Sequence, residues 1–283
     1  MPSKIIDGKL IAKKIREELR EKVKTLEFKP CIAFVLVGNE PASQIYVSNK
    51  IKACEEVGFK SKKIQLDESI DEIELMKVVD ELNQDKKVTA FIVQLPLPKH
   101  INSNLIIDCI LPHKDADGMT PLNLGNLAVG NNLIVPATPK GIIRLIESTG
   151  ISIEGKNAAV LGRSNSVGKP VAMLLLQKNA TVTICHSKTI NLAEITSRAD
   201  ILVAAIGKPR FVTKDMVKKG AVVIDVGINR LSDGKLVGDV DFDSVKSIAG
   251  FITPVPGGVG PMTIAMLMEN TLECAGLRKT LEN

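Results

Sequence analysis

The only tyrosine of the chain, Tyr46, stands four residues before Lys50 in a segment with helical character. On a helix this spacing places the phenol and the ammonium side by side on one face. Such a pair can pass or stabilise a proton, or hold an aromatic ring beside a charge. The other interpretation is a half-buried Tyr beside a solvated Lys. These two residues alone leave both interpretations open.

Three further segments carry polar groups where the backbone is restricted. Gln94 follows the apolar run FIV and precedes LPLP, so we expect its amide to project from a strand end. KDADG, residues 114–118, places Asp115 and Asp117 in a turn, where either is equally an ordinary turn former. PGGVGPMT, residues 256–263, is either a flexible linker or a segment whose glycines allow a ligand to approach the backbone closely.

A glycine-containing loop, GRSNSVGKP at residues 162–170, lies between a strand-like run and a helical segment. Gly162 permits a tight turn, Gly168 permits close packing of helix on strand, and the helix start presents free N–H groups to a phosphate. Ser164 occupies the second glycine position of the usual dinucleotide motif GxGxxG. The motif alone is therefore a weak match that its strand-to-helix context strengthens, and a tight connection without a ligand is the alternative.

The strand-like run ATVTIC is followed by His186, Ser187 and Lys188. An NAD site has Asp or Glu at this point to hold the ribose hydroxyls. Here that carboxylate is missing, whereas Arg163, Ser187 and Lys188 offer charge and hydrogen bonds to a 2′-phosphate. We therefore expect NADP, with exposed polar residues that bind nothing as the alternative.

The helices and strands that must position these groups alternate along the chain. Helical spacing predicts an amphipathic helix near the N-terminus, built on Ile5, Leu10, Ile11, Ile15, Leu19 and Val23. Short buried runs at 31–38 and 89–98, a probable strand KKIQL, and helices around Tyr46 and at about 71–82 predict a first parallel α/β sheet.

Residues 112–140 are rich in Gly, Pro and Asn with little period, which predicts a loop region and a domain junction. The alternation then restarts with a helix at 141–149 and the strands NAAVLG, ATVTIC, DILVAAIG and AVVIDVG, interleaved with helices. Such alternation of strands and helices is typical of a doubly wound nucleotide-binding domain. An apolar helix from Ile264 to about Ala275 follows.

Length and composition limit the number of domains, the classes of ligand and the cellular compartment. A length of 283 residues predicts two domains, and the net charge of +5 is spread along the chain without a basic, aromatic-rich stripe for nucleic acid. The five cysteines are scattered without a CxxC pair and the three histidines are equally dispersed, so we expect a reduced compartment and no metal. We find no run apolar enough to span a membrane, and acidic residues in the first helix argue against a transit peptide, so we expect a cytoplasmic protein.

Six motifs occur together in one order: SQIYVSNK, VQLPLP, KDADG, GRSNSVGKP, HSKT and PGGVGPMT. In this order and approximate spacing the chain resembles the bifunctional methylenetetrahydrofolate dehydrogenase/methenyltetrahydrofolate cyclohydrolases, from IIDGK to the last helix. Each motif alone is unspecific, whereas six in register are highly specific. Ala137 stands where the family commonly has Cys, and Ala116 replaces a usual Val, but neither is expected to do chemistry.

The resemblance implies a two-domain α/β fold. Residues 1–137, completed by 257–283, would form a folate-binding catalytic domain on which the C-terminal helix packs back, and 138–256 would form a Rossmann-like NADP domain. The family usually forms homodimers through the NADP domain, with both ligands in the cleft between the domains. The implied activity is NADP-dependent oxidation of methylenetetrahydrofolate and hydrolysis of the methenyl product, in one-carbon metabolism and purine biosynthesis.

The resemblance also implies roles for single residues. Tyr46 would stack on the aminobenzoyl ring, Lys50 would transfer protons, Gln94 would orient Lys50, and Asp117 would bind the pterin edge. Further substrate contacts would come from Leu95, Pro256, Gly257 and Gly258. The cofactor would contact Gly162, Arg163, Ser164, Ser187 and Ile228.

Two competing interpretations concern function. A short-chain dehydrogenase also uses a YxxxK pair, but there the glycine loop precedes the Tyr and Lys, whereas here Lys50 comes well before Gly162. The non-enzyme alternative is an NADP-binding regulatory module with an inactive folate site. The presence of Tyr46, Lys50, Gln94 and Asp117 argues against it.

Overall fold

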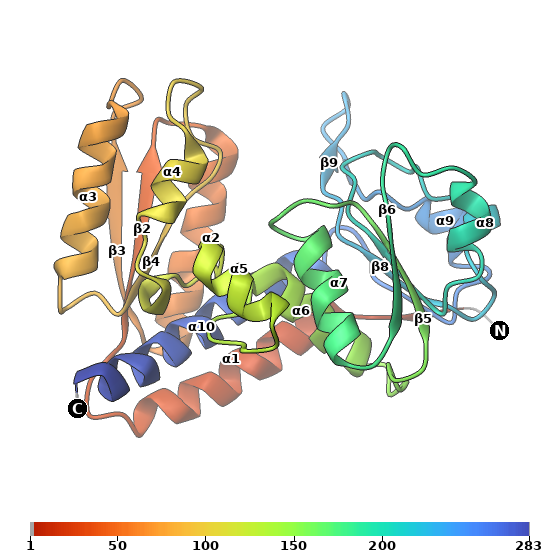
Figure 1. Ribbon diagram of the computed structural model, residues 1–283, viewed down its shortest axis with the longest axis horizontal. Coiled ribbons are helices and arrows are strands. Elements are labelled where there is room, and N and C mark those ends of the chain that lie inside the picture. The colour runs from red at the N-terminus through yellow and green to blue at the C-terminus, as the bar shows by residue number, and fades with distance from the viewer. Residues whose placement is uncertain (1–2, 283) are drawn as a thin grey trace. The chain divides into compact units, whose positions relative to one another are not determined.

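The computed structural model describes residues 3–282, and the chain forms two compact units (Figure 1). The three-stranded unit comprises Lys13–Ala137 and Ile264–Asn283, and the six-stranded unit comprises Met1–Ala12 and Thr138–Thr263. Both contain parallel sheets with helices, which confirms the predicted α/β fold class. The functional domain boundaries expected at 137/138 and 256/257 stay predictions.

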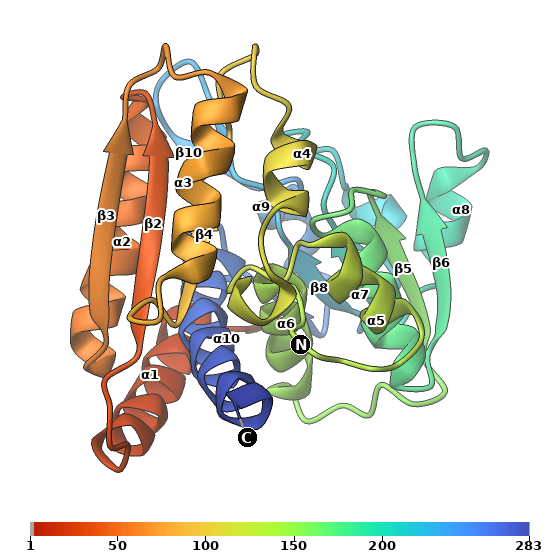
Figure 2. The same ribbon diagram turned by 60° about the vertical axis from the view of Figure 1, so that its left-hand side comes forward.

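The three-stranded unit is built on the parallel sheet β3–β2–β4. Its strands are β2 (Cys31–Val37), β3 (Lys60–Leu66) and β4 (Ala90–Val93). The central strand β2 is apolar throughout because helices cover both of its faces. Figure 2 shows α2 (Pro41–Val57) on one face, and α3 (Glu72–Gln84) and α4 (Ser103–Asp108) on the other.

The ends of α2 are marked by local signals that fix where its side chains point. The Glu40 carboxylate accepts the N–H of Ser43 at 2.6 Å, and Pro41 opens the helix with a preset φ. Gly58 closes it in the left-handed conformation, with φ +91°. The helix register between these caps determines the face on which Tyr46 and Lys50 lie.

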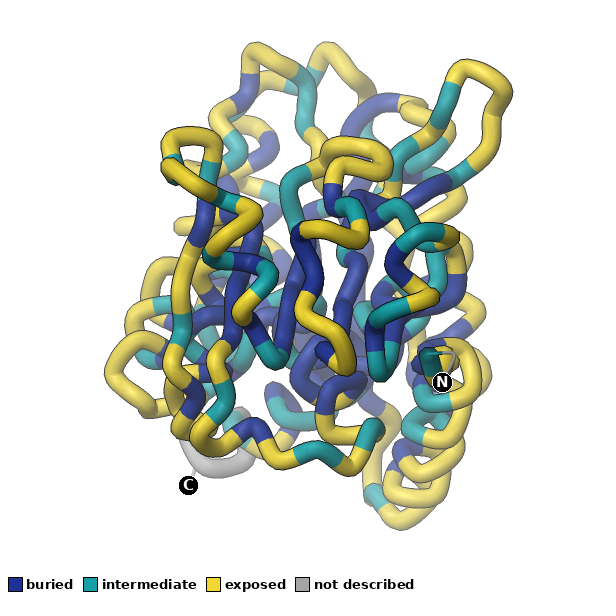
Figure 3. Tube along the Cα trace, turned by 90° about the vertical axis from the view of Figure 1, so that its right-hand side faces the viewer, coloured by how far each residue is buried: buried dark blue, intermediate teal, exposed yellow. Residues whose placement is uncertain are grey.

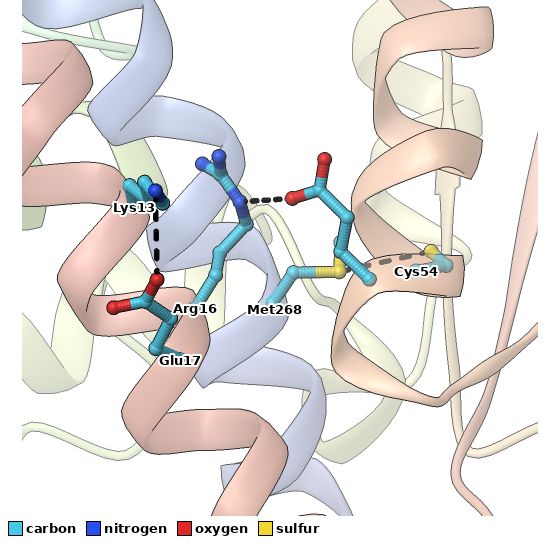
Figure 4. Close-up of polar contacts among 6 residues, drawn as sticks. Lys13, Arg16, Glu17, Cys54 and Met268 are labelled. Carbon is cyan, nitrogen blue, oxygen red and sulfur yellow. Dashed lines mark hydrogen bonds and ion pairs between the residues drawn. The ribbon is translucent and has the colours of Figure 1, made fainter.

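Two long helices, α1 (Gly8–Lys24) and α10 (Val259–Glu282), each begin in the six-stranded unit and continue in the three-stranded unit. Figure 4 shows their contacts with α2 within the three-stranded unit. Arg16 Nε donates to Glu56 Oε2 at 2.7 Å, and the Cys54 thiol lies 3.7 Å from Met268 Sδ. The α10 segment from Ile264 onward therefore completes the core of the three-stranded unit.

The six-stranded unit contains one parallel sheet in the order β1–β11–β8–β7–β5–β6. Strands β7 and β8 are fully buried and β5 is buried after its first residue, and Figure 3 shows the interior of the sheet as dark blue stretches within exposed loops. Reversal of strand order next to β5 is the arrangement of a dinucleotide-binding sheet. The strands are β1 (Lys4–Ile5), β5 (Asn157–Leu161), β6 (Thr181–Cys185), β7 (Ile201–Ala204), β8 (Val222–Asp225) and β11 (Phe251–Ile252).

The remaining elements of the six-stranded unit lie between these strands. They are α6 (Ala137–Glu147), α7 (Gly168–Gln177), α8 (Leu192–Thr196), the 3₁₀ helix η2 (Lys214–Met216), the antiparallel pair β9 (Asn229–Arg230) and β10 (Leu236–Val237), and α9 (Phe242–Val245). The pair β9–β10, together with α9 and β11, was not expected from the sequence. Each is four residues or shorter, too brief to show a hydrophobic period.

Two sequence expectations were wrong in detail. Ile5 is not in the first helix: it lies in β1, is half exposed and pairs with Ile252, while α1 begins at Gly8. Residues 112–140 are not all loop, because they contain η1 (Pro112–Lys114), α5 (Pro121–Ala128) and the start of α6. A Thr120 cap followed by Pro121 marks α5, but the helix is only eight residues long and contains Gly125.

Candidate active site and cofactor site

Lys50 and Gln94 meet in the three-stranded unit. Lys50 lies on the buried side of α2, with 9% of its surface exposed, and its Nζ donates to Gln94 Oε1 at 3.0 Å. Gln94 directly follows β4, and its own N–H donates to Val35 O at 2.8 Å, which continues the sheet. Gln94 Nε2 donates to Leu95 O at 2.6 Å, so the amide is oriented with its oxygen toward the amine.

The electrostatics at Lys50 favour a neutral amine. Burial lowers the pKa of Lys50, because a charged ammonium loses hydration there, and the nearby Asp117 carboxylate opposes this shift. Lowering the pKa of an amine makes its neutral, proton-accepting form more accessible, as a general base requires. The arrangement can therefore serve proton transfer.

Asp117 is held by a buried turn. Asp115 is buried and accepts the N–H of Gly118 at 2.9 Å and of Thr120 at 2.7 Å. Burial raises the pKa of Asp115, and its hydrogen bonds oppose that shift. Asn270 of α10 donates to Ala116 O at 2.9 Å. The structure thus separates the two carboxylates that the sequence left equivalent: Asp115 forms the turn, and the half-buried Asp117 lies near Lys50.

Two apolar side chains on this unit are accessible to a ligand. Tyr46, one turn before Lys50 on α2, is 44% exposed, and Leu95, beside Gln94, is 39% exposed. An exposed phenol can stack on a planar aromatic ligand. The three-stranded unit therefore brings together five of the predicted site residues: Tyr46, Lys50, Gln94, Leu95 and Asp117.

The other predicted substrate residues belong to the six-stranded unit. Gly257 has φ +112°, and its carbonyl accepts the N–H of Lys9 at 3.1 Å. A Cβ on Gly258 would lie 2.7 Å from Pro254 O, so this glycine is required by packing. Pro256 is exposed. A role of these three residues in substrate binding stays a prediction.

The glycine loop of the six-stranded unit is tightly built. Gly162 has φ +116°, and a Cβ there would overlap Ala205 O; a Cβ on Gly168 would overlap Gly162 O. Ser164 Oγ accepts the N–H groups of Val167 at 3.1 Å and Gly168 at 3.3 Å at the start of α7. The loop keeps a close, side-chain-free backbone at the carboxyl end of β5, which suits a dinucleotide.

Arg163 and Ser187 follow neighbouring strands. Leu161 of β5 pairs with Cys185 of β6, and Gly162 N donates to Cys185 O at 2.9 Å. Arg163 and Ser187 are both exposed just beyond this pair, where a ribose phosphate would be held. Ile228 follows β8 at the same edge of the sheet and is 50% exposed.

Sequence reasoning missed three buried polar residues, Asp225, Asp239 and Asn270. Asp225 ends β8, and a polar residue closing an apolar run was the one signal available for it. Within residues 3–282, no cluster of His, Cys, Asp and Glu could hold a metal ion. Nor does any helix in that range have the length and apolarity needed to cross a membrane.

Comparison with known proteins gives full-length matches. Residues 6–117 match the family model for the tetrahydrofolate dehydrogenase/cyclohydrolase catalytic domain, and residues 136–279 match that for its NAD(P)-binding domain. The bifunctional protein FolD of Thermodesulfovibrio yellowstonii is 55% identical over 282 residues, 99% of each chain.

Solved structures also match this chain over nearly its full length. The bifunctional FolD enzyme of Campylobacter jejuni has a TM-score of 0.95 and 48% identity, covering 98% of this chain and 99% of that one. The Trypanosoma brucei methylenetetrahydrofolate dehydrogenase-cyclohydrolase, complexed with NADP cofactor and inhibitor, has a TM-score of 0.94 and 38% identity, covering 100% of both chains. The chain belongs to the tetrahydrofolate dehydrogenase/cyclohydrolase family.

Proposed function

We propose that this protein oxidises methylenetetrahydrofolate to methenyltetrahydrofolate with NADP and then hydrolyses the product to formyltetrahydrofolate. The observation that carries this proposal is the buried Lys50 amine, hydrogen-bonded to Gln94 and close to Asp117. Membership of a family of dehydrogenases and cyclohydrolases supplies the substrate class. In the cell this activity would serve one-carbon metabolism and purine biosynthesis.

In this mechanism the residues of the three-stranded unit bind the folate and move protons. Tyr46 stacks on the aminobenzoyl ring, Asp117 binds the pterin edge, and Leu95 lines the folate with Pro256, Gly257 and Gly258. When bound, NADP would supply the hydride acceptor for the methylene carbon, and this transfer would release no proton. Positioning therefore matters more than a base in the first reaction.

The second reaction needs proton transfer. Water adds to the methenyl carbon, and the neutral Lys50 amine takes the proton that the water loses. The carbon–nitrogen bond then breaks, protonated Lys50 returns its proton to the leaving nitrogen, and the hydroxyl loses its own proton to solvent as the formyl carbonyl forms. Gln94 orients Lys50 through the 3.0 Å hydrogen bond, so that the amine keeps one direction throughout.

The six-stranded unit would hold the cofactor through Gly162, Arg163, Ser164, Ser187 and Ile228. Arg163 and Ser187 supply the groups for a 2′-phosphate, and no carboxylate follows β6 before Asn191 to compete for the ribose hydroxyls. We therefore propose that NADP is preferred over NAD. The Trypanosoma brucei relative was solved in complex with NADP, which supports NADP as a cofactor.

One assay tests the activity. Purified protein is mixed with methylenetetrahydrofolate and NADP, and NADPH and methenyltetrahydrofolate are followed separately by absorbance. The proposal expects NADPH to appear and methenyltetrahydrofolate to be consumed. Binding of NADP without either turnover would favour a regulatory module instead, an alternative that none of the reported relatives supports.

We also propose a cytoplasmic homodimer that assembles through the six-stranded unit. The edge strand β6 carries Ile184, 41% exposed, and α7 carries Leu176, 63% exposed, so apolar side chains are available for an interface. Five free cysteines suit a reducing compartment. Light scattering of the native protein and of Ile184→Lys measures the assembly, and a monomeric native protein would exclude it.

A further inference from the structure

Two carboxylates are buried side by side at the carboxyl ends of the strands of the six-stranded sheet, where the cofactor is proposed to bind. Asp225, the last residue of β8, is 3% exposed, and Asp239, after β10, is fully buried. Among the described residues neither has a salt-bridge partner. Burying two carboxylates without a cation is costly unless hydrogen bonds replace the lost water.

Backbone N–H groups supply those hydrogen bonds. Asp225 Oδ1 accepts from Gly227 N at 3.0 Å and from Asp239 N at 2.8 Å, and its Oδ2 accepts from Val240 N at 3.0 Å. Asp239 Oδ2 accepts from Ile206 N at 2.7 Å and from Gly207 N at 3.0 Å. Asp239 thus holds the loop after β7, and Asp225 holds both the loop after β8 and the backbone of Asp239. Together the two residues join the loops that follow β7 and β8.

The surrounding glycines fit these carboxylates closely. A Cβ on Gly227 would overlap Asp239 Oδ1, and a Cβ on Gly238 would overlap Asp225 Oδ2. Asn229 of β9 completes the arrangement by donating from Nδ2 to Asp239 Oδ1 at 2.9 Å. Every carboxylate oxygen of the pair therefore has an N–H donor. Positions 227 and 238 have no space for a side chain larger than that of glycine.

Asp239 also acts on the glycine loop. A peptide group is planar and trans, so fixing the N–H of Ile206 fixes the carbonyl of Ala205 in the opposite direction. That carbonyl is the group packed against Gly162, and Ala205 N donates to Leu161 O at 2.8 Å. Loss of Asp239 would free this peptide to rotate beside Gly162.

We propose that Asp225 and Asp239 are positioning residues for the nicotinamide half of the cofactor, because they hold residues 205–207 and 226–228 in one binding shape. This inference rests on the proposed cofactor site. The adenosine half is assigned to β6 through Ser187, and in a doubly wound sheet the other mononucleotide half lies across β7 and β8. Exposed Ile228 directly follows the segment that Asp225 holds.

The titration of Asp225 agrees with a functional location. Burial raises its pKa to about 7, although the three backbone N–H donors oppose the shift. Perturbed carboxyl groups of this kind gather at functional sites.

The test compares Asp239→Ala with Asp239→Asn. In Asp239→Asn the amide oxygen can still accept from Ile206 and Gly207, and Asn229 can turn its own amide to match. We expect Asp239→Ala to raise the Kd for NADPH and the KM for NADP at least tenfold, and Asp239→Asn to stay within about threefold of the native protein. Cyclohydrolase turnover of added methenyltetrahydrofolate requires no cofactor and should stay within about twofold in both variants.

Asp200→Ala is the matched control. Asp200 also accepts a backbone N–H, that of Asn157 at 3.0 Å. It precedes β7, however, and so lies at the amino-terminal end of the parallel strands, opposite to the proposed cofactor site. Its loss should lower the melting temperature without changing the Kd for NADPH. All binding is measured by NADPH fluorescence at a temperature where circular dichroism shows each variant folded.

An unchanged Kd in folded Asp239→Ala would overturn the inference and leave the pair a structural feature. If that variant does not fold, Gly238→Ala decides, because it keeps both carboxylates but displaces Asp225 Oδ2; the same tenfold rise is expected, and an unchanged Kd again overturns the inference. Arg163→Ala distinguishes a wrong role for Asp225 and Asp239 from a wrong cofactor site. If Arg163→Ala also leaves NADPH binding unchanged, the proposed cofactor site itself is wrong.

Discussion

The buried amine of Lys50 opposes folding at the same time as it equips the site for proton transfer. Within residues 3–282 the amine has one hydrogen-bond partner, Gln94, and its burial lowers its pKa. Activity and stability should therefore respond in opposite directions when the amine is removed. Lys50→Met tests both, because it keeps much of the length and apolar bulk of the side chain.

Lys50→Met should separate the two activities. General acid–base help is worth about a hundred- to ten-thousand-fold, so cyclohydrolase turnover should fall by at least a hundredfold while dehydrogenase activity stays measurable. Methenyltetrahydrofolate should then accumulate and be visible by absorbance. Lys52→Met, at an exposed lysine of the same helix, is the control. Undiminished cyclohydrolase turnover would falsify the proton-transfer role, and equal loss of both activities would assign Lys50 to folate binding.

The same variant should change the pH dependence of stability. Since the folded-state pKa of Lys50 is lowered, the unfolded chain keeps this proton to a higher pH than the folded chain. Native stability contributed by this group therefore rises with pH between the folded pKa and about 10.4. Lys50→Met should melt at a higher temperature than the native protein below that window, and the difference should shrink toward pH about 10.4. A difference independent of pH would contradict this.

Arg163 should control cofactor choice. A hydrogen bond to a charged group contributes about 1.5–3 kcal/mol, so Arg163→Ala should raise the KM for NADP by about ten- to a hundredfold. The KM for NAD should change little, because NAD lacks the 2′-phosphate. Arg198→Ala removes an equally exposed arginine, paired with Glu194 on α8, and should affect neither. Equal catalytic efficiency of the native protein with both cofactors would contradict the assignment.

At the scale of elements, α10 supports the turn that presents Asp117. Asn270 Nδ2 donates to Ala116 O at 2.9 Å and to Val135 O at 2.8 Å, so one side chain ties two loops of the three-stranded unit to the helix. Its complete burial means that water cannot replace these bonds. The position of Asp117 thus depends on a helix far along the chain.

Asn270→Leu should therefore weaken folate binding. Leucine fills similar space but leaves two buried carbonyls without this donor, at about 1–3 kcal/mol each. We expect a lower melting temperature and a several-fold higher KM for the folate in both reactions. The Kd for NADPH, measured on the same preparation, is the internal control. An unchanged folate KM would show that the turn keeps its shape without α10.

The sequence predicted elements wherever a local pattern was long enough. The helices expected around Tyr46 and at about 71–82 correspond to α2 and α3, and the buried runs located β2, β4, β5 and β7. Short elements such as β1 and β11 escaped because their pairing joins residues nearly the whole chain apart, Lys4 with Phe251. Asp225 and Asp239 escaped for a related reason, since their partners are backbone N–H groups of three separate loops. Tyr46, Lys50 and Gln94 could be singled out because a helix face and a strand end are local features.

At the scale of the whole molecule, we expect α1 and α10 to make the two units thermodynamically dependent on each other. Each helix is continuous from one unit into the other. A ligand that stabilises one unit should therefore also restrain the part of these helices that belongs to the other. NADP is the suitable probe, because the folate site is not expected to bind it.

NADP at about a hundred times its Kd should stabilise the protein by about 2.7 kcal/mol. We expect slower amide hydrogen exchange in the six-stranded unit and also in the Lys13–Lys24 part of α1 and the α10 segment from Ile264 onward. Exchange in α3, which belongs wholly to the three-stranded unit, is the reference. Protection confined to the six-stranded unit, or two separate thermal transitions of which NADP shifts only one, would contradict the coupling.

The pairing of β1 with β11 has a consequence for biosynthesis. Ribosomes add about 5–20 residues per second, so Lys4 is made roughly ten seconds to a minute before its partner Phe251. During that interval β1 lacks its pairing strand β11, and the three-stranded unit still lacks the α10 segment that carries Met268 and Asn270. The sheet of the six-stranded unit is therefore complete only when β11 has been made, and a chain that stops before α10 would lack the helix that completes the core of the three-stranded unit.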